Sequence, residues 1–515
     1  MLELDKRVRK FFDFIGDEGK LAFSTCFIVG LLCHMFVFVG HYPAYSGLNL
    51  FINEGDWQLL EGRWLAALLM RINGKVTLPF LIGVISLTFW SLANIIVIRL
   101  FEIKSKISIV LISSIFISFP VIAGMNYYLY MAECYGISAF LGCLGVLFWK
   151  KGSSTKNSIW SVLCFTLCIS SYQAELSAAM VLIFLLLALN IIEGYRINKI
   201  IFEALRAAII LLVSLGLWYG TFKLYLLFNK IDSYRDVSIN VSTILQGIWK
   251  SYSGADWFWR LGTFFALPTG RLVTVFTIVD TFLFGGIVFL YQQKKGVIEK
   301  TIRSLMIVIL IALFPIIANY TFIISPNEDM TYRQFLAHIF VFVMPLILCD
   351  KYCEGLSSHN NKVVQYVINL QKHVSVIMAV VTIVFFCVIC NTAYMNSYLQ
   401  YEREYSLAVR MIERIELTQG YYPGMEVVLI QTDGYNTYGG NVVNLVGEYI
   451  PGMEQSGYGI MSTSTGIQNF MNEFIHTKVT FICGTASEEI LNMLDVFPAS
   501  NCTIVKDGKL YFLLS

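Results

Sequence analysis

Residues 374–394 read Val374-Ser-Val-Ile-Met-Ala-Val-Val-Thr-Ile-Val-Phe-Phe-Cys-Val-Ile-Cys-Asn-Thr-Ala-Tyr394 and contain no charged side chain. A helix of this length rises about 30 Å, which matches the hydrocarbon core of a bilayer. The run is continuously apolar and lacks the alternation of a membrane barrel strand. It therefore predicts a membrane-spanning helix.

The rest of the chain has the same character. Hydrophobic residues make up 57% of its 515 residues and charged residues 14%, against about 25% charged in soluble domains. This composition excludes a soluble enzyme, and the 15% aromatic content excludes disorder. We predict an all-α polytopic membrane protein with about 11 transmembrane helices. The other ten runs lie at about 21–39, 77–98, 107–124, 131–149, 159–174, 177–192, 204–226, 272–291, 304–324 and 335–349.

The distribution of Lys and Arg predicts the orientation. Basic residues gather in the N-terminus and in the connections near 99–106, 150–156, 196–199, 294–303 and 351–372. These segments are expected in the cytoplasm, and 41–75, 125–130, 227–270, 325–333 and everything after about 395 outside. The basic loops share one side only if 159–192 forms two short helices, which favours two over one long helix.

The polar C-terminal part predicts a second domain. We expect a transmembrane domain at 1–395 and a small extracytoplasmic α/β domain at 396–515. A helical stretch, Leu407 to Leu417, precedes candidate strands at 426–431, 478–483, 502–505 and 510–514. Cys483 and Cys502 either form a disulfide or remain two separate buried thiols, and the second alternative is favoured.

Charge and cysteine content give little indication of other chemistry. The net charge of +2 does not indicate nucleic-acid binding. The twelve Cys are mostly single residues within apolar runs, and neither they nor the six His show metal-ligand spacing. No cofactor is expected, and no residues are predicted to bind a metal, but metal dependence stays open.

The first outer loop holds acids and an Arg close to the membrane face. Glu54, Asp56 and Glu61 precede or flank Arg63, and Trp64 follows. Asp56 and Arg63 are seven residues apart, so they can share a helix face. A carboxylate there can accept a proton from a sugar hydroxyl, and a guanidinium can hold a lipid phosphate. The alternative is an ordinary interfacial loop anchored by Trp64.

Three further clusters lie at the predicted outer ends of spans. In the first, Glu133 and Tyr130 stand among several Tyr and form either a sugar site or an aromatic belt. Glu175 faces a polar cavity or serves as a helix N-cap. Arg333, after Tyr332, is a phosphate anchor or a snorkelling interfacial residue.

The long outer loop 227–270 combines Trp with Lys and Arg. This content fits an amphipathic helix on anionic lipid, or a segment that helps to hold a lipid-linked substrate.

Four short strings carry a family resemblance. Asn53-Glu-Gly-Asp-Trp57 with Gly62-Arg-Trp64, then Ser171-Tyr-Gln173 and Tyr332-Arg333, resemble the Gtr-type glucosyl transferases of bacterial O-antigens and cell-wall polysaccharides. The resemblance covers about residues 20–350. It implies the C-type glycosyltransferase fold and a place in the bacterial plasma membrane. It also implies inverting transfer of a sugar from a polyprenyl-phosphate carrier on the outer face.

The resemblance also implies residue roles and partners. Asp56 matches the catalytic base, with Glu54 as the alternative, and Arg63 and Arg333 would hold the donor phosphate. The substrate-binding candidates are Glu133, Tyr130, Trp64 and Tyr332. Expected partners are the lipid-linked sugar, a surface polysaccharide acceptor, membrane lipid, a donor-synthesising glycosyltransferase and a flippase, with no nucleic acid.

Two other functions stay open at this point. A lipid-linked polysaccharide flippase or transporter would also have many spans, but the sequence shows no internal repeat. A polysaccharide polymerase or ligase typically needs several outer Arg and His, and this chain has few outer His.

Overall fold

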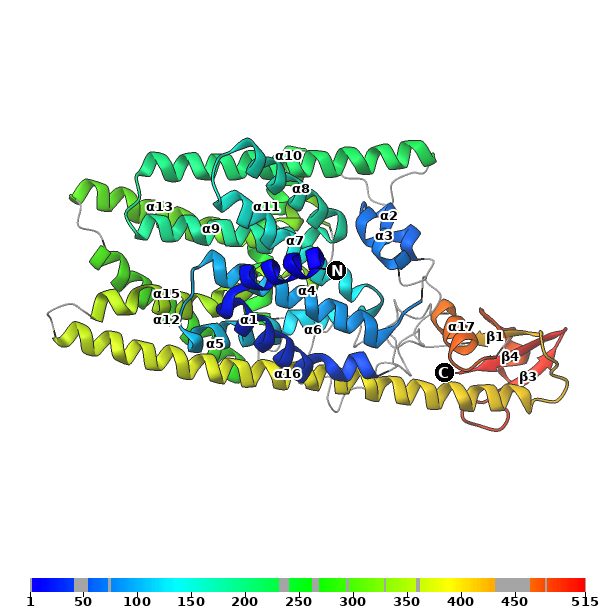
Figure 1. Ribbon diagram of the computed structural model, residues 1–515. Coiled ribbons are helices and arrows are strands. Elements are labelled where there is room, and N and C mark those ends of the chain that lie inside the picture. The colour runs from blue at the N-terminus through cyan, green and yellow to red at the C-terminus, as the bar shows by residue number, and fades with distance from the viewer. Residues whose placement is uncertain are drawn as a thin grey trace.

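The protein is mostly helical, and its helices run side by side along the length of the molecule (Figure 1). A small sheet lies beyond the end of the bundle where α2 and α3 lie. The computed structural model describes residues 2–40, 54–72, 76–230, 240–261, 268–292, 296–327, 330–357, 362–430, 464–477 and 479–514.

Among these residues, nine helices are long and apolar enough to cross a membrane, and a bent pair makes ten. The bent pair is α5 (Lys106–Ser118) and α6 (Pro120–Asn126), which meet at 43°. Pro120 starts the second helix and lacks the N–H that would continue the first. The nine are α1 (Leu2–Val39), α4 (Pro79–Leu100), α7 (Ala132–Lys150), α9 (Leu176–Ile192), α10 (Ile197–Asn229), α12 (Pro268–Gln292), α13 (Val297–Ala318), α15 (Ile339–Ser357) and α16 (Lys362–Glu416).

The stretch 159–192 forms two helices, as predicted. Helix α8 (Thr155–Ser171) and α9 are separated by the short 3-10 turn η3 (Gln173–Glu175). Tyr172 before that turn is extended, with φ −154° and ψ 115°. Helix α8 has 17 residues, as has α9, and it packs between α7 and α10.

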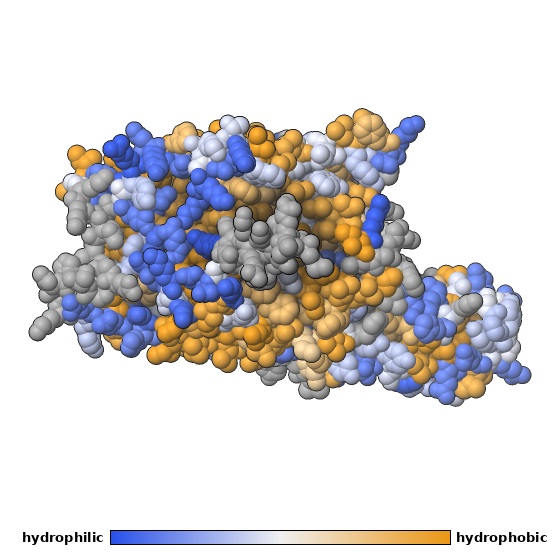
Figure 2. Space-filling view, viewed as in Figure 1, coloured by the Kyte–Doolittle hydropathy of each residue, from blue (hydrophilic) through white to orange (hydrophobic). Residues whose placement is uncertain are grey.

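The basic loops come together at one end of the bundle, which confirms that they share a side. Lys150 binds Glu102 at 2.7 Å, and this hydrogen bond lowers the pKa of Glu102. Asp350 accepts hydrogen bonds from the backbone N–H groups of Lys104 and Ser105, each at 3.0 Å. Figure 2 shows hydrophobic residues over the middle of the bundle and hydrophilic residues gathered toward this end.

The opposite end is built from short elements. They include α11, which matches the helix predicted within 227–270 and begins with a capping box between Asn240 and Thr243. Gly247 of α11 lies against the backbone of Phe322 and Ile323, where a Cβ would come within 2.4 Å of the Phe322 carbonyl oxygen. The short elements are α2 (Glu54–Leu60), α3 (Trp64–Ile72), η2 (Leu129–Met131), η3, α11 (Val241–Asp256), η4 (Trp257–Leu261), α14 (Thr321–Ile324), η6 (Tyr332–Gln334) and η7 (Leu336–His338).

Helix α16 joins the bundle to the C-terminal region without a break. The sequence predicted separate helices at 374–394 and 407–417, and this prediction is wrong because one helix covers both. The residues that connect the two predicted helices include good helix formers such as Glu, Arg and Leu. No Gly or Pro occurs between Lys362 and Gly420. The far end of α16 packs Leu407, Met411 and Ile415 against the sheet.

The C-terminal sheet has the order β2-β1-β4-β3. Strand β1 is parallel to both β2 and β4, and β3 and β4 form an antiparallel hairpin. Helix α17 (Ser464–Glu473) packs with α16 on one face, and α18 (Glu488–Leu491) covers the other. Cys502 is a buried free thiol, and the Cys483 side chain lies outside the described residues. The strands are β1 (Glu426–Ile430), β2 (Thr480–Cys483), β3 (Thr503–Lys506) and β4 (Lys509–Leu513), close to the four predicted.

Candidate active site

A glycine turn between α2 and α3 places Arg63. The N–H of Arg63 bonds the carbonyl oxygen of Gln58 at 2.8 Å, and the N–H of Gly62 bonds that of Leu59 at 3.0 Å. This pair of bonds is a Schellman motif, which requires a left-handed residue. Gly62 supplies it with φ +78°. Asp56 therefore lies on α2 and Arg63 in the turn after it, and the expectation that they share one helix face is wrong.

The Arg63 guanidinium is held from several sides. Its Nη1 lies 2.5 Å from the Glu61 carboxylate and donates to Gln58 Oε1 at 3.1 Å. Its Nε donates to Gln173 Oε1 at 2.7 Å, and its Cζ lies 5.0 Å from the Tyr172 ring centroid. The side chains of Arg63 and Glu61 are only 13% and 8% exposed. The charge is fixed in position and largely shielded from water.

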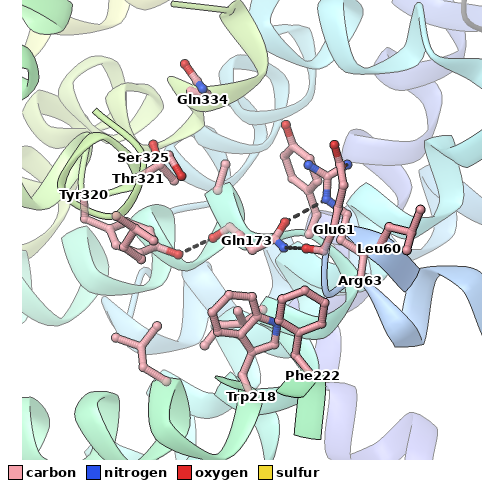
Figure 3. A pocket seen from close by; sticks show the side chains of 15 residues that line it. Leu60, Glu61, Arg63, Gln173, Trp218, Phe222, Tyr320, Thr321, Ser325 and Gln334 are labelled. Atoms are coloured by element: carbon pink, nitrogen blue, oxygen red, sulfur yellow. Dashed lines mark hydrogen bonds and ion pairs between the residues drawn. The ribbon is translucent and has the colours of Figure 1, made fainter. Parts of the chain in front are cut away.

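Gln173 connects three elements around this Arg (Figure 3). Its Nε2 donates to the Glu61 carbonyl oxygen at 2.7 Å, and its own carbonyl oxygen accepts from the Tyr320 hydroxyl. Trp218 Nε1 donates to the Gly62 carbonyl oxygen at 2.9 Å. The glycine turn is thus clamped by η3 on one side and α10 on the other.

A cavity opens beside this arrangement. The empty space within it is about 790 Å³, a volume that includes open solvent at its mouth. Figure 3 shows Gln173 between Tyr320 and the Glu61–Arg63 pair, with Trp218 and Phe222 on another wall. Aromatic walls with a few fixed polar groups suit a ligand that has both an apolar and a charged part. The lining residues are Leu60, Glu61, Arg63, Ile169, Tyr172, Gln173, Ala174, Leu215, Trp218, Phe222, Tyr320, Thr321, Ile324, Ser325 and Gln334.

Arg333 and Tyr332, predicted from a distant part of the sequence, lie at the same end of the bundle. The Arg333 guanidinium sits over the Tyr128 ring with Cζ 3.9 Å from the centroid. Tyr332 is buried and packs on Trp257, with ring centroids 5.1 Å apart. Among the described residues, their neighbour Gln334 lines the cavity, whereas Arg333 and Tyr332 do not.

Two tyrosines connect the two arginines. The Tyr172 ring, over which Arg63 lies, meets the Tyr135 ring edge-on at 4.7 Å. Tyr135 lies within electrostatic range of both Arg63 and Arg333. Both guanidinium groups thus lie near one aromatic pair, Tyr135 and Tyr172.

The other predicted substrate residues are buried near this pair. Glu133 lies in the first turn of α7 and Tyr130 in η2, and both are almost fully buried. Tyr130 packs against Tyr128 at 6.3 Å. Trp64 begins α3, directly after Arg63. None of these three lines the cavity among the described residues.

Asp56 and Glu54 fall at the edge of the described region. Their backbone belongs to α2, within two turns of the glycine corner, and their side chains lie outside the described residues.

Glu175 is the N-cap of α9 but makes no side-chain cap hydrogen bond, and it is 1% exposed. Over the described part of the chain, no group of three or more His, Cys, Asp or Glu is placed to hold a metal.

Several residues of the site were not predicted. Glu61 was noted only as a third loop acid, yet it is the partner of Arg63. Gln173 belonged to a noted string but had no assigned role, and Trp218 and Tyr320 come from predicted spans without any local signal. A Gly followed by a basic residue after a short helix does indicate a C-cap, so the turn at Gly62 could have been found.

The fold and the site together define a polytopic helical membrane protein with a charged, aromatic-lined cavity at one end. The family model described as Glucosyl transferase GtrII matches residues 49–350, which include every residue that lines the cavity. That range is more than half of the 515 residues, so the chain belongs to the GtrII glucosyl transferase family. A search of curated proteins gives no match.

Proposed function

We propose that this glucosyl transferase takes its sugar from a polyprenyl-phosphate carrier and transfers it, with inversion, to a surface polysaccharide on the outer face of the bacterial plasma membrane. The observation that carries the proposal is the shielded Arg63 guanidinium in the wall of an aromatic cavity. A lipid phosphate needs a fixed positive charge, and the carrier and sugar need apolar and aromatic surface.

The orientation follows from the basic loops. They gather at the end opposite the cavity, and the positive-inside tendency places that end in the cytoplasm. With α8 counted as a crossing and α5–α6 as one, the described residues would form eleven spans, and this odd number supports an N-terminus inside and a C-terminal α/β region outside. This arrangement fits the C-type glycosyltransferase fold.

The reaction would need one base and one anion site. A carboxylate of α2, Asp56 or alternatively Glu54, takes the proton of the acceptor hydroxyl as its oxygen attacks C1 of the sugar. The bond between C1 and the phosphate oxygen breaks, and the negative charge stays on the leaving phosphate. Arg63 stabilises that charge, with Arg333 contributing from outside the cavity wall as a more distant positive charge. Glu133, Tyr130, Trp64 and Tyr332 shape the surroundings of the sugar.

The test is a transfer assay with the purified protein, polyprenyl-phosphate-linked glucose and the host polysaccharide. Asp56→Asn should lower the rate about a hundredfold or more if Asp56 is the base. Glu54→Gln is the parallel variant, and Asp17→Asn, an exposed carboxylate at a helix kink of α1, is the matched control. Full activity in both Asp56→Asn and Glu54→Gln would show that neither carboxylate of α2 is the catalytic base. Lipid translocation without sugar transfer would identify a transporter instead.

A further inference from the structure

The ion pair between Glu61 and Arg63 occupies the place where the donor phosphate is needed. Both side chains line the cavity, and they are 2.5 Å apart. A guanidinium that is 13% exposed is costly to leave without a negative partner. The unloaded site therefore needs an internal anion, and Glu61 provides it.

Arg63 does not depend on Glu61 for its position. Gln173 accepts from Nε and Gln58 accepts from Nη1, and both partners are uncharged. Nη2 donates no hydrogen bond to any residue in the described part of the chain. The guanidinium can therefore exchange one anion for another while its amide partners keep it in place.

The charges of the two anions match. A sugar joined to a polyprenyl phosphate is a phosphodiester with one negative charge, which equals the charge of the Glu61 carboxylate. After transfer, the polyprenyl monophosphate gains a second ionisation with a pKa of about 6. The product is therefore attracted to Arg63 more strongly than the donor, and a returning carboxylate would help to displace it.

We propose that Glu61 is an exchangeable anion: it neutralises Arg63 in the unloaded enzyme, yields Arg63 to the donor phosphate, and returns as the product leaves. This inference rests on the proposed function, since it requires a lipid-phosphate donor. Glu61 acts here as a positioning residue through Arg63.

Binding of a polyprenyl monophosphate to the purified full-length protein tests the exchange. Glu61→Gln removes the competing charge but keeps an oxygen for Arg63, so it should bind the lipid about tenfold tighter than wild type. Glu203→Gln is the matched control, because the Glu203–Arg206 pair is similarly shielded but lies at the basic end. It should bind like wild type. Polyprenol without phosphate should show no difference between the variants.

Kinetics supply a second measurement. Glu61→Gln should lower the KM for the donor and also lower kcat, because the product leaves slowly. Glu61→Asp keeps the charge with a shorter reach, and its affinity should fall between wild type and Glu61→Gln. Equal or weaker lipid binding in both Glu61 variants would overturn the exchange.

The failure of the proposed function would look different. If wild type, Glu61→Gln and Arg63→Gln all bind the lipid equally poorly, the donor is not a polyprenyl phosphate. If wild type binds it in an Arg63-dependent way and Glu61→Gln binds no better, the donor assignment stands and the exchange is wrong.

Discussion

The two ends of the helical bundle use arginine in different ways. At the basic end, Arg303 donates to the carbonyl oxygens of Ile191, Gly194 and Tyr195 and pairs with Glu299. At the cavity end, the described residues that hold the Arg63 guanidinium do so with side chains only: two amides, one carboxylate and one aromatic ring.

The difference indicates which charge is structural and which can exchange partners. Backbone carbonyl oxygens cannot leave without unfolding the loop that carries them, so Arg303 is bound permanently. Side-chain partners can rotate away at a modest cost in free energy. The arginine that sequence reasoning assigned to function is the one whose partners are replaceable.

The largest effect should come from removing the permanent arginine. Arg303→Met removes one donor from each of three carbonyl oxygens, of which that of Ile191 still accepts from the Gly194 N–H, and should lower the free energy of unfolding by about 3 kcal/mol. Unfolding in increasing denaturing detergent measures this loss. Arg196→Met, an exposed Arg at the same end, is the control and should change stability by less than about 0.5 kcal/mol. Equal midpoints of unfolding for the two variants would show that Arg303 has no special structural role.

Sequence reasoning predicted the parts of this fold that depend on local composition. The approximate positions of the apolar helices, the common side of the basic loops and the four strands follow from hydrophobic runs and charge that are visible within about 20 residues. The joining of α16 into one helix was missed because polar helix formers were interpreted as a boundary.

The site could be predicted only in part. Arg63 was found because it stands in a short charged loop between apolar runs. Its contacts with Gln173 and the Trp218 bond to Gly62 span 110 and 156 residues of sequence, and no local pattern encodes such pairings. The shared face of Asp56 and Arg63 was mispredicted because a continuous helix was assumed across Gly62, which is left-handed.

Two glycines at opposite ends of the bundle have the same backbone φ angle. Gly62 at the cavity end and Gly194 at the basic end both have φ +78°. A Cβ on Gly62 would lie 3.0 Å from Trp218 and 3.2 Å from Phe222, whereas a Cβ on Gly194 meets nothing within 4 Å. Both Ala variants should lose about 1 kcal/mol from backbone strain.

Only Gly62→Ala should also disturb the cavity. A shift of the turn displaces Arg63, and transfer activity should fall about tenfold or more, since small misplacements of a binding group are costly. Gly194→Ala should keep its activity after correction for the folded fraction. A parallel loss of activity in both variants would mean that strain alone, and not the contact with α10, determines the geometry of the site.

The smallest effect concerns single hydrogen bonds of similar length at the two ends. Trp218 donates to the Gly62 carbonyl oxygen at 2.9 Å, and the Tyr352 hydroxyl donates to Glu193 at 2.8 Å. Trp218→Phe and Tyr352→Phe should each lower the free energy of unfolding by about 1 kcal/mol. The donor KM should rise about threefold in Trp218→Phe alone, because only that bond fixes the turn that carries Arg63. An equal rise in KM for Tyr352→Phe would show that the cavity responds to the stability of the whole bundle. The distinction between a structural basic end and a functional cavity end would then be wrong.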